Sequence, residues 1–436
     1  MTEPPFCEQA LVIVLAKELV LEYCNYCLTK TQALKRCSAC RMMAYCSPQC
    51  QKNDWRQHRP ECKAIVARRF VADDGIRLVM RLVQLYEANI ITPATDQEGP
   101  SGTRTFYDLE DGGDRLNSSA EAFLDTFKKF AIAPFSTDDV VKHMYKKVAM
   151  NSVSASNPFG SHIGIALCIK LTAARHSCKP ATRVAFRNRL VMLVPTSKCP
   201  MNVESACHSY IDELQPVNTR KKILKEKYGF DCDCEGCLDN ERNDRMEAFC
   251  CGNCTNGWIK NAENATCSTC DWKMTPEHFQ MCQIAENSAI QGEPILMQDD
   301  VPMNKRIDMG EKLLFMANNT LHRYNVLRLP IYRLLFGASV VTKNIPLARK
   351  YGLAMLELQL QYQNENDLAI LYHKLRLAQI MIAGNAIDIA KQLLESIYKP
   401  YVEIFGMESL ATNNIKLMLN GINQSATSSI PSPPSL

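Results

Sequence analysis

The chain has 436 residues, of which 46% are hydrophobic and 22% are charged, and its formal net charge is +4. This length exceeds one ordinary core and predicts roughly two to four domains, while so small a net charge does not by itself indicate nucleic-acid binding. The longest apolar run near the N-terminus, residues 10–21, contains Lys17 and Glu18 and is too short to span a bilayer. No membrane anchor or signal peptide is expected, and an intracellular location follows.

The 21 cysteines are the strongest signal in the composition. In a reducing compartment disulfides are not expected, so clustered cysteines indicate metal ligands. Most of the cysteines lie in closely spaced pairs. The remaining ones are interpreted as small buried hydrophobes: Cys7, Cys168, Cys199, Cys207, Cys250 and Cys282.

The first cysteine-rich region carries four ligand pairs at zinc-binding spacings. They are Cys24-x2-Cys27, Cys37-x2-Cys40, Cys46-x3-Cys50 and His58-x3-Cys62. Eight ligands suffice for two closed tetrahedral zinc sites, which would hold together a segment that lacks a sizeable core. The alternative, a disulfide framework, requires a secreted chain, which nothing else in the sequence indicates. Closed sites leave the metal no free position, so the zinc should be structural and the function should lie on the surface of the module.

This surface is basic. Between positions 30 and 69 there are ten Lys or Arg residues against two acids, Asp54 and Glu61. A solvated face around structural zinc explains such a charge, and contact with nucleic acid is the alternative interpretation.

Helical periodicity marks two further regions. Residues 63–150 begin with the run IRLVMRLVQLYEANI, which predicts a helix, and continue into a loop rich in Gly, Asp, Ser, Thr and Pro, about residues 92–119, that is expected to be mobile. Residues 275–423 predict successive helices, joined by the short segments NEND and AGNA, so that neighbours should pack antiparallel. Their apolar faces are Leu347, Tyr351, Met355, Leu358 and Tyr362; Leu368, Tyr372, Leu375 and Ile382; and Ala386, Ala390, Leu394 and Ile397. The tail, residues 424–436, is expected to be disordered.

The central region, residues 151–274, combines strand-like runs such as TRVAF and LVMLV with further cysteine clusters. Cys232, Cys234 and Cys237 are one ligand short of a tetrahedral site. Cys178, in the run RHSC, is the natural candidate for the fourth ligand. Beyond them, Cys251-x2-Cys254 and Cys267-x2-Cys270 have the spacing of a zinc ribbon, in which Cys250 could replace Cys251 but the two-residue gap favours Cys251.

The run YCSPQCQKNDWRQHRPEC closely resembles a MYND zinc finger. In that family the ligand pairs interleave. The resemblance therefore implies one zinc held by Cys24, Cys27, Cys46 and Cys50, and a second held by Cys37, Cys40, His58 and Cys62. MYND fingers commonly dock proline-rich peptides, for which Trp55 and Tyr45 could supply an aromatic wall.

The runs IGIALCIKLTAARHSCKP, SYIDEL and YGFDCDCEGC resemble the SET domain and post-SET loop of the SET-and-MYND (SMYD) family of protein-lysine methyltransferases. The resemblance extends from residue 21 to about residue 423. It implies an α+β protein, in which a SET β-fold with an inserted MYND finger and a post-SET zinc loop is followed by a C-terminal, all-helical, TPR-like domain. The implied divisions are residues 1–23 (remnant of the N-terminal SET strands), 24–62 (MYND finger), 63–150 (inserted helical region), 151–229 (SET core), 230–274 (post-SET and ribbon), 275–423 (helical domain) and 424–436 (tail).

SET domains transfer a methyl group from S-adenosylmethionine to a lysine amine, with a tyrosine hydroxyl and backbone carbonyls around the amine. The resemblance makes Tyr210 the catalytic tyrosine, which also contacts the cofactor, and places Phe230 against the adenine. Asn151 and His176 match cofactor contacts of the family, and Cys178 joins the three post-SET cysteines around one zinc. From spacing alone, a core aromatic and a hydrogen-bonded core histidine are the better readings of Tyr210 and His176.

Three departures from the family pattern weaken the enzymatic interpretation. Arg175 replaces an asparagine that binds the cofactor; a guanidinium cannot accept hydrogen bonds and would bring positive charge close to a sulfonium, although it could reach the cofactor's carboxylate. The residues before Cys24 contain no glycine, whereas family members carry a Gly-x-Gly strand. The family's Gly-Glu-Glu turn is Val203-Glu204-Ser205 here, and Ala181 replaces an asparagine.

Two functions therefore remain open at the level of sequence. The first is an S-adenosylmethionine-dependent lysine methyltransferase that acts on histones or other proteins, with three or four zinc ions per chain. The second is a non-catalytic zinc-binding adaptor that binds partners such as proline-rich peptides through the MYND finger and the helical domain. A monomer in the nucleus or cytoplasm is expected in either case.

Overall fold

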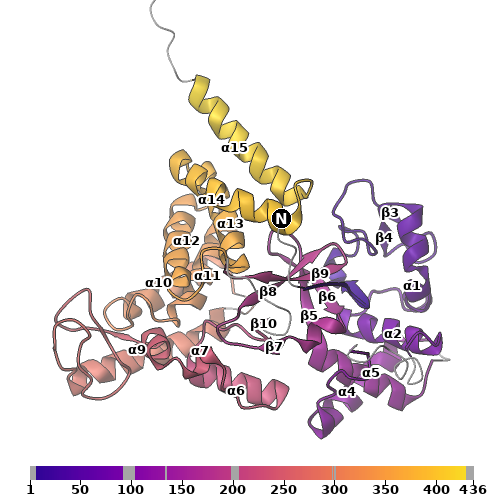
Figure 1. Cartoon of the computed structure of the whole chain (residues 1–436), viewed down its shortest axis with the longest axis horizontal. Coiled ribbons are helices and arrows are strands. Elements are labelled where there is room, and N and C mark those ends of the chain that lie inside the picture. The colour runs from indigo at the N-terminus through magenta and orange to yellow at the C-terminus, as the bar shows by residue number, and fades with distance from the viewer. Residues whose placement is uncertain are drawn as a thin grey trace, which may run out of the picture.

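The computed structural model describes residues 6–91, 104–132, 135–197, 206–296, 298 and 301–428 (Figure 1). Strands lie in the middle of the molecule, between the N-terminal zinc-finger and helical segments on one side and the C-terminal helices on the other. The α+β class predicted from the sequence is confirmed. None of the described helices is long and apolar enough to cross a membrane.

Two three-stranded antiparallel sheets form the central part. In the first, with the order β1-β9-β8, the strands are Phe6–Gln9, Leu190–Pro195 and Thr182–Arg187; in the second, with the order β2-β6-β5, they are Val12–Leu15, His162–Leu167 and Ser152–Ser156. The predicted runs TRVAF and LVMLV lie in β8 and β9, which form a hairpin. One N-terminal strand pairs at the edge of each sheet, so the residues before the zinc finger belong to the central fold.

Short elements surround the sheets. They are η1 (Lys17–Leu19), β3 (Lys35–Arg36), β4 (Ala44–Tyr45), η3 (Lys170–Ala173), β7 (Arg175–His176), β10 (Cys207–His208), α6 (Val217–Tyr228), α7 (Glu235–Leu238), α8 (Asn240–Met246), β11 (Phe249–Cys250) and β12 (Trp258–Ile259). β7 and β10 pair in parallel, although they are far apart in the sequence. This pairing brings the RHSC run beside the segment that leads to Tyr210.

Four longer helices, α1, α2, α4 and α5, cover the N-terminal side; they span Pro48–Arg68, Asp74–Glu87, Asn117–Phe130 and Asp138–Asn151. The helix predicted from residues 76–90 is α2, and it ends before Ile90. The loop expected over residues 92–119 is partly wrong, because η2 (Gly113–Leu116) and the start of α4 fall within it. Lys146 on α5 donates to the carbonyl of Gly113 at 3.1 Å and holds this part of the segment in place. Residues 92–103 lie outside the described residues.

Seven helices, α9 to α15, form the C-terminal side; they span Pro276–Leu296, Met303–Ala317, Arg328–Val341, Ile345–Leu360, Leu368–Ala383, Ile387–Phe405 and Leu410–Ser428. Each helix from α9 to α15 packs on the next one along the chain, as the short joints predict. The three predicted apolar faces lie on α12, α13 and α14, except that Tyr362 follows the end of α12 and Ala386 directly precedes α14. α15 continues to Ser428, so the predicted disordered tail starts too early, and residues 429–436 lie outside the described residues.

The isolated cysteines only partly match their prediction. Cys168 and Cys282 are buried, whereas Cys207 and Cys250 are half-buried and Cys7 is exposed. Cys7 lies on an edge strand with alternating exposure, which turns it outward between Phe6 and Glu8. Cys199 lies outside the described residues.

A buried charge cluster joins the zinc finger to the sheet. Asp54 and Glu61 on α1 face Arg77 and Arg81 on α2, and all four side chains are almost fully buried. Arg81 places Nη1 2.9 Å from Asp54 and Nη2 2.9 Å from Glu61, and Arg77 donates to the other oxygen of Glu61. The two arginines also donate to the carbonyls of Ile13 and Leu15 on β2.

The pairing with both arginines explains how Glu61 stays ionised. Burial alone would raise the pKa of Glu61, but the positive charges of Arg81 and Arg77 hold it well below its usual range. In the same way, burial lowers the pKa of Arg81 less than Asp54 and Glu61 raise it. The cluster is therefore a set of true ion pairs, in which each charge depends on its partners.

We expect Glu61→Gln to destabilise the protein strongly, because it leaves two buried arginines with too little negative charge. The expected loss is about 3–5 kcal/mol of unfolding free energy, measured by urea denaturation with zinc present. Glu87→Gln, an exposed position at the end of α2, is the matched control and should leave the denaturation midpoint within error. Equal midpoints for the two variants would contradict this account.

Candidate active site and zinc centres

The zinc-finger segment places its eight predicted ligands in two separate clusters. One cluster contains Cys24, Cys27, Cys46 and Cys50, and the other contains Cys37, Cys40, His58 and Cys62, with the ligand atoms of each cluster within 4.8 Å of one another. These are the interleaved sets that the resemblance implied. Each offers the four donors of a closed tetrahedral site, so the donor chemistry fits structural zinc.

A buried carboxylate orients the histidine of the second cluster. His58 Nε2 lies 3.6 Å from Cys40 Sγ, while Nδ1 lies 3.3 Å from Glu61 Oε2. A ligating histidine commonly donates its second ring N–H to a carboxylate, which fixes the ring and raises its basicity. Glu61 therefore acts on this zinc site from outside the ligand set, and the charge cluster and the zinc site share a residue.

Five side chains converge at the central cluster. Cys178, just after β7, lies with Cys232, Cys234 and His176 within the same 4.8 Å limit. Cys237 lies close by, with its Sγ 3.6 Å from that of Cys178. The four predicted ligands thus lie together, and the structure adds His176 as a competitor for the fourth position.

The hydrogen bonds of His176 favour Cys237 as the ligand. The backbone N–H of Tyr210 donates to Nδ1 at 3.0 Å, so this nitrogen carries no proton. A neutral ring then has its proton on Nε2, which lies 3.2 Å from Cys178 Sγ and can donate to it. Burial lowers the pKa of His176, which favours the neutral ring. His176 is thus suited to donate to a metal-bound thiolate, which leaves Cys237 to complete the donor set.

The ribbon cysteines form a fourth cluster of Cys251, Cys254, Cys267 and Cys270. Cys250, the alternative to Cys251, is not one of these four and has its Sγ 3.3 Å from the carbonyl oxygen of Leu321. At Gly257 a Cβ would lie 2.2 Å from Cys267 Sγ, so only glycine lets the backbone approach the thiol this closely.

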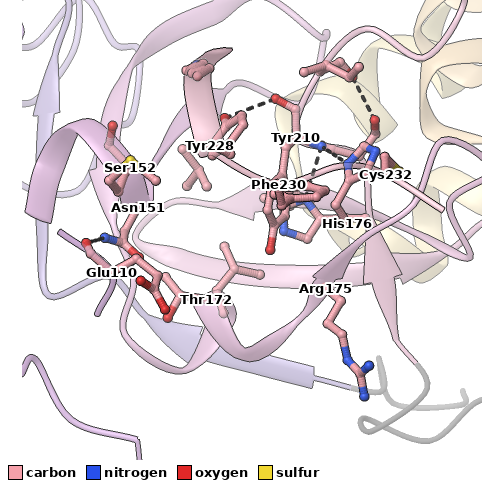
Figure 2. A pocket seen from close by; sticks show the side chains of 18 of the residues that line it. Glu110, Asn151, Ser152, Thr172, Arg175, His176, Tyr210, Tyr228, Phe230 and Cys232 are labelled. Atoms are coloured by element: carbon pink, nitrogen blue, oxygen red, sulfur yellow. Dashed lines mark hydrogen bonds between the residues drawn. The ribbon is translucent and has the colours of Figure 1, made fainter. Parts of the chain in front are cut away.

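A cavity of about 970 Å³ lies beside the central cluster (Figure 2). All five residues predicted for catalysis or cofactor binding line it: Asn151, Arg175, His176, Tyr210 and Phe230. They come from the end of α5, from β7, from the turn after β10 and from the segment after α6. The volume lies at the upper end of the range for small-molecule pockets and would accept a nucleoside-sized ligand.

Tyr210 occupies the middle of this cavity wall. Its hydroxyl donates to the carbonyl oxygen of Ala174 at 2.8 Å, and its ring centroid lies 5.3 Å from that of His176. Burial, with the neighbouring Tyr228, raises the pKa of Tyr210, and Arg104 opposes this shift only in part. The hydroxyl therefore remains protonated at neutral pH. A hydroxyl beside a backbone carbonyl offers both a hydrogen-bond donor and an acceptor, and a neutral amine can use both.

Tyr228 is a pocket residue that the sequence reasoning missed. Its hydroxyl donates to the carbonyl of Tyr210 at 3.3 Å, and its ring lies 5.2 Å from the Tyr210 ring and 6.5 Å from the Phe230 ring. The available signal was the run YGF, since a glycine that ends a helix turns the chain between two aromatic residues. The cavity thus has an aromatic wall of Tyr210, Tyr228 and Phe230.

Arginines from the expected loop also line the cavity. Arg104 donates to Thr172 Oγ1 at 2.8 Å and to the carbonyl of Asp108 at 3.2 Å. Arg115 lines the cavity near α6. No pattern in the sequence marked either residue, because a segment without periodicity gives no indication of where its side chains lie.

Arg175 and Asn151 lie in surroundings different from those expected. Arg175 is exposed, and Figure 2 shows its side chain extending away from Tyr210 and Phe230, because adjacent strand residues face opposite sides. Its positive charge is thus removed from the aromatic wall. Asn151 is buried and donates its amide hydrogens to the carbonyls of Glu110 and Lys147, at 2.6 and 2.7 Å. Its side-chain oxygen is the atom left to face a ligand.

The N-terminal strands support the cavity although they lack glycine. Glu8 on β1 accepts hydrogen bonds from the backbone N–H groups of Lys170 and Leu171, at 3.1 and 2.6 Å. These bonds cap η3, which has no side-chain cap of its own and leads directly into β7. Two other positions depart from the family pattern. Ala181, which replaces an asparagine, donates its N–H to Cys207 Sγ at 3.4 Å. Residues 203–205 lie outside the described residues.

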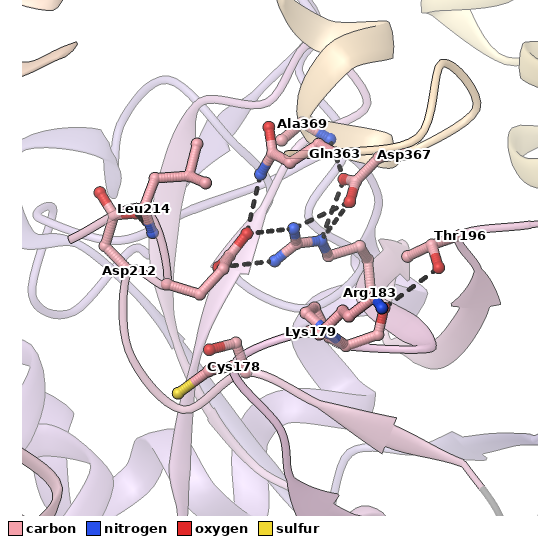
Figure 3. Close-up of polar contacts among 12 residues, drawn as sticks. Cys178, Lys179, Arg183, Thr196, Asp212, Leu214, Gln363, Asp367 and Ala369 are labelled. Atoms are coloured by element: carbon pink, nitrogen blue, oxygen red, sulfur yellow. Dashed lines mark hydrogen bonds and ion pairs between the residues drawn. The ribbon is translucent and has the colours of Figure 1, made fainter. Parts of the chain in front are cut away.

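A second buried ion cluster surrounds Arg183 (Figure 3). Arg183 on β8 contacts Glu213, three residues after Tyr210, with 3.0 Å between Nη1 and Oε2, and contacts Asp367 with 2.9 Å between Nε and Oδ1. Asp367 also caps α13 by accepting the N–H of Ala369, and Gln363 donates to Glu213 at 2.8 Å. Burial would raise the pKa of Glu213, but Arg183 and Gln363 lower it overall. The cluster ties the Tyr210 segment to the C-terminal helices.

Closed cysteine-rich zinc clusters, a β-fold and an aromatic cavity beside one of the clusters define the class of zinc-finger proteins built on a SET-type fold. Residues 24–62 match the MYND finger family. The chain is 44% identical over 413 residues to SET domain-containing protein 14 of Caenorhabditis elegans, an alignment that covers 94% of this chain and 96% of that protein. The chain belongs to the SET-and-MYND (SMYD) family.

Relatives named as methyltransferases match over a shorter length. The chain is 27% identical over 227 residues to the N-lysine methyltransferase SMYD2 of Homo sapiens, and 27% identical over 235 residues to the histone-lysine N-methyltransferase SMYD3 of Homo sapiens. Each alignment covers 51% of this chain, and they cover 52% and 53% of those proteins respectively. The chain thus spans about half the length of these two relatives.

The zinc assignment predicts about four zinc ions per chain, measured by mass spectrometry of the purified, metal-replete protein. Cys237→Ser should lower the content by one ion, whereas His176→Gln should keep all of them, because the histidine donates to a thiolate and does not bind the metal. Cys250→Ser is the matched control and should also keep the full content. Loss of zinc from His176→Gln together with retention in Cys237→Ser would reverse the assignment.

The ion cluster around Arg183 predicts coupled loosening of two distant segments. Arg183→Ala leaves Glu213 and Asp367 buried without a cation, and we expect a loss of about 3–5 kcal/mol of unfolding free energy. Amide hydrogen exchange should rise both in residues 210–214 and in the first turn of α13. Arg349→Ala, an exposed arginine on α12, serves as the control. A rise in only one of the two segments would contradict the coupling.

Proposed function

We propose that this protein is an S-adenosylmethionine-dependent protein-lysine methyltransferase. The observation that carries the proposal is the single cavity beside the central zinc cluster, which gathers Tyr210, Phe230, Asn151 and His176 from separate segments. The similarity to two named lysine methyltransferases supports it. We further propose that the domain divisions expected from the sequence apply, with the SET core over residues 151–229, the post-SET and ribbon segment over 230–274 and the helical domain over 275–423.

The residues of the cavity fit the cofactor by their chemistry. The rings of Phe230 and Tyr228 suit an adenine, Asn151 offers an amide oxygen, and Arg104 offers positive charge to a carboxylate. His176 would contribute only its ring face or backbone, because both ring nitrogens have partners within the protein. The exposed direction of Arg175 weakens the charge objection that its sequence position raised.

When bound, S-adenosylmethionine supplies an electrophilic methyl group on a sulfonium. The residues of this chain would position the substrate lysine against it. The Ala174 carbonyl would accept an N–H of the neutral amine, and the Tyr210 hydroxyl would fix its orientation, so that the nitrogen lone pair faces the methyl carbon. The aromatic wall would exclude water from the amine. The methylated product would be released as an ammonium and would then lose a proton to solvent.

The proposed substrate is a lysine-containing segment of a histone or another protein. We propose that the MYND finger docks proline-rich peptides beside Trp55, which is 43% exposed. Tyr45, which was expected to share this wall, is instead buried and donates its hydroxyl to Asp54. Contact with nucleic acid through the basic surface, a monomeric state, and residence in the nucleus or cytoplasm are parts of the same proposal. Under the adaptor alternative, the cavity would be a structural remnant that binds no cofactor.

Calorimetry with S-adenosylmethionine separates the enzyme from the adaptor. We expect micromolar binding to the zinc-replete protein and a dissociation constant at least about tenfold higher in Phe230→Ala, which loses an aromatic face. Tyr210→Phe should lower turnover about a hundredfold. Because the pKa of Tyr210 is raised, this deficit should be constant from about pH 7 to about pH 9. Phe315→Ala, an exposed position on α10, is the control. Absence of binding at millimolar cofactor would favour the adaptor.

A further inference from the structure

The end of helix α6 receives a side chain from a distant segment of the chain. Arg115, in η2, donates from Nη1 to the carbonyl of Lys227 at 3.3 Å and from Nη2 to the carbonyl of Tyr228 at 3.2 Å. The last carbonyls of a helix have no partner within it and carry its negative end charge. A guanidinium with two donors therefore suits this position both by hydrogen bonding and by charge.

Gly229 is shaped to accept this arginine. It ends α6 in the left-handed region, with φ of +83°, and donates its N–H to the carbonyls of Leu224 and Lys225. A Cβ at this position would lie 2.6 Å from Arg115 Cζ. Glycine is thus required both by the backbone conformation and by the closeness of the guanidinium.

The segment that carries Arg115 is itself held in place by α5. Lys146 donates to the carbonyl of Gly113 at 3.1 Å, and Asn151 donates to the carbonyl of Glu110 at 2.6 Å. Lys147 donates to the carbonyl of Tyr107 at 3.1 Å. Arg115 is therefore presented from a segment that α5 holds in place through three side-chain hydrogen bonds.

Two residues beside this contact, Tyr228 and Phe230, belong to the aromatic wall of the cavity. The carbonyl of Tyr228 accepts from Arg115, and the Tyr228 hydroxyl donates to the Tyr210 carbonyl at 3.3 Å. Phe230 comes directly after Gly229. We propose that Arg115 is a positioning residue that clamps the end of α6 and thereby sets Tyr228 and Phe230 against the cavity. This role rests on the proposed function only where it concerns the cofactor; the clamp itself is a property of the fold.

Amide hydrogen exchange without cofactor tests the clamp directly. Arg115→Ala should speed exchange in residues 228–234 by about fivefold to tenfold, the effect of losing about one to two hydrogen bonds. Arg115→Lys should show an intermediate change, because an ammonium keeps the charge but cannot span both carbonyls. Lys222→Ala, which removes an exposed cation from the same helix, is the control. Exchange in Arg115→Ala equal to that of the control would overturn the clamp, whether or not the protein binds cofactor.

Measurements of cofactor binding test whether the Arg115 clamp orders the cofactor pocket. In Arg115→Ala the dissociation constant and the KM for S-adenosylmethionine should rise about fivefold to tenfold while kcat changes little, because the clamp orders the pocket and does not touch the reacting atoms. An unchanged dissociation constant with faster exchange would keep the clamp and overturn its role in the pocket. If the wild-type protein binds no cofactor, the proposed function and this pocket role both fail, and the exchange result still decides on the clamp.

A double-mutant cycle with Gly229→Ala isolates the contact between the two residues. In the wild-type background the new methyl group meets the guanidinium and also suffers the unfavourable φ. In the Arg115→Ala background only the φ effect remains. Gly229→Ala should therefore speed exchange in residues 228–234 by a smaller factor when Arg115 is absent. Equal factors in the two backgrounds would contradict the packing of Arg115 on Gly229.

Discussion

The structure depends above all on Glu61, one buried carboxylate that serves two purposes at once. It faces the ring nitrogen of His58 and pairs with Arg77 and Arg81, which in turn donate to carbonyls of β2. A zinc cluster, two helices and an edge strand are thus joined by charge-assisted hydrogen bonds between buried side chains. Since any single deletion would leave an unpaired buried charge, the zinc finger is fixed to the sheet as part of one body.

A second ion cluster joins the Tyr210 segment to the C-terminal helices. Arg183 places one guanidinium between Glu213, which follows the catalytic candidate Tyr210, and Asp367, which caps α13. A planar group with several donors in fixed directions can bind two carboxylates simultaneously, which an ammonium cannot do with the same geometry. In both clusters arginine connects segments distant in sequence, so the cavity is held between two rigid supports.

The metal clusters, helices and strands that follow local sequence patterns could be predicted from the sequence. Cysteine spacing indicated the ligand pairs, because two ligands close in sequence can reach one metal ion, and the resemblance to MYND fingers implied how the finger pairs interleave. Periodicity indicated α2, α12, α13 and α14, and the strand-like runs TRVAF and LVMLV indicated β8 and β9. The sequence did not predict that His176 lies among the thiols, because the position of the ring depends on which ring nitrogen accepts the Tyr210 N–H. Nor could it show that Arg175 extends away from the aromatic wall, which follows from the orientation of a two-residue strand.

The cavity is the part least accessible from the sequence, because it is built where unrelated segments meet. Tyr228 and Phe230 come from the end of α6 and the segment after it, Tyr210 follows β10, and Arg104 and Arg115 come from a stretch without periodicity that was expected to be a mobile loop. Such a stretch has no pattern because its conformation is set by side chains of other elements, here Lys146, Lys147 and Asn151 on α5. Erosion of family motifs at Arg175 and in the N-terminal strands therefore says less about activity than it first suggests. What a cofactor would meet is decided by Tyr228, Phe230 and Arg115, and their arrangement depends on how α6 ends.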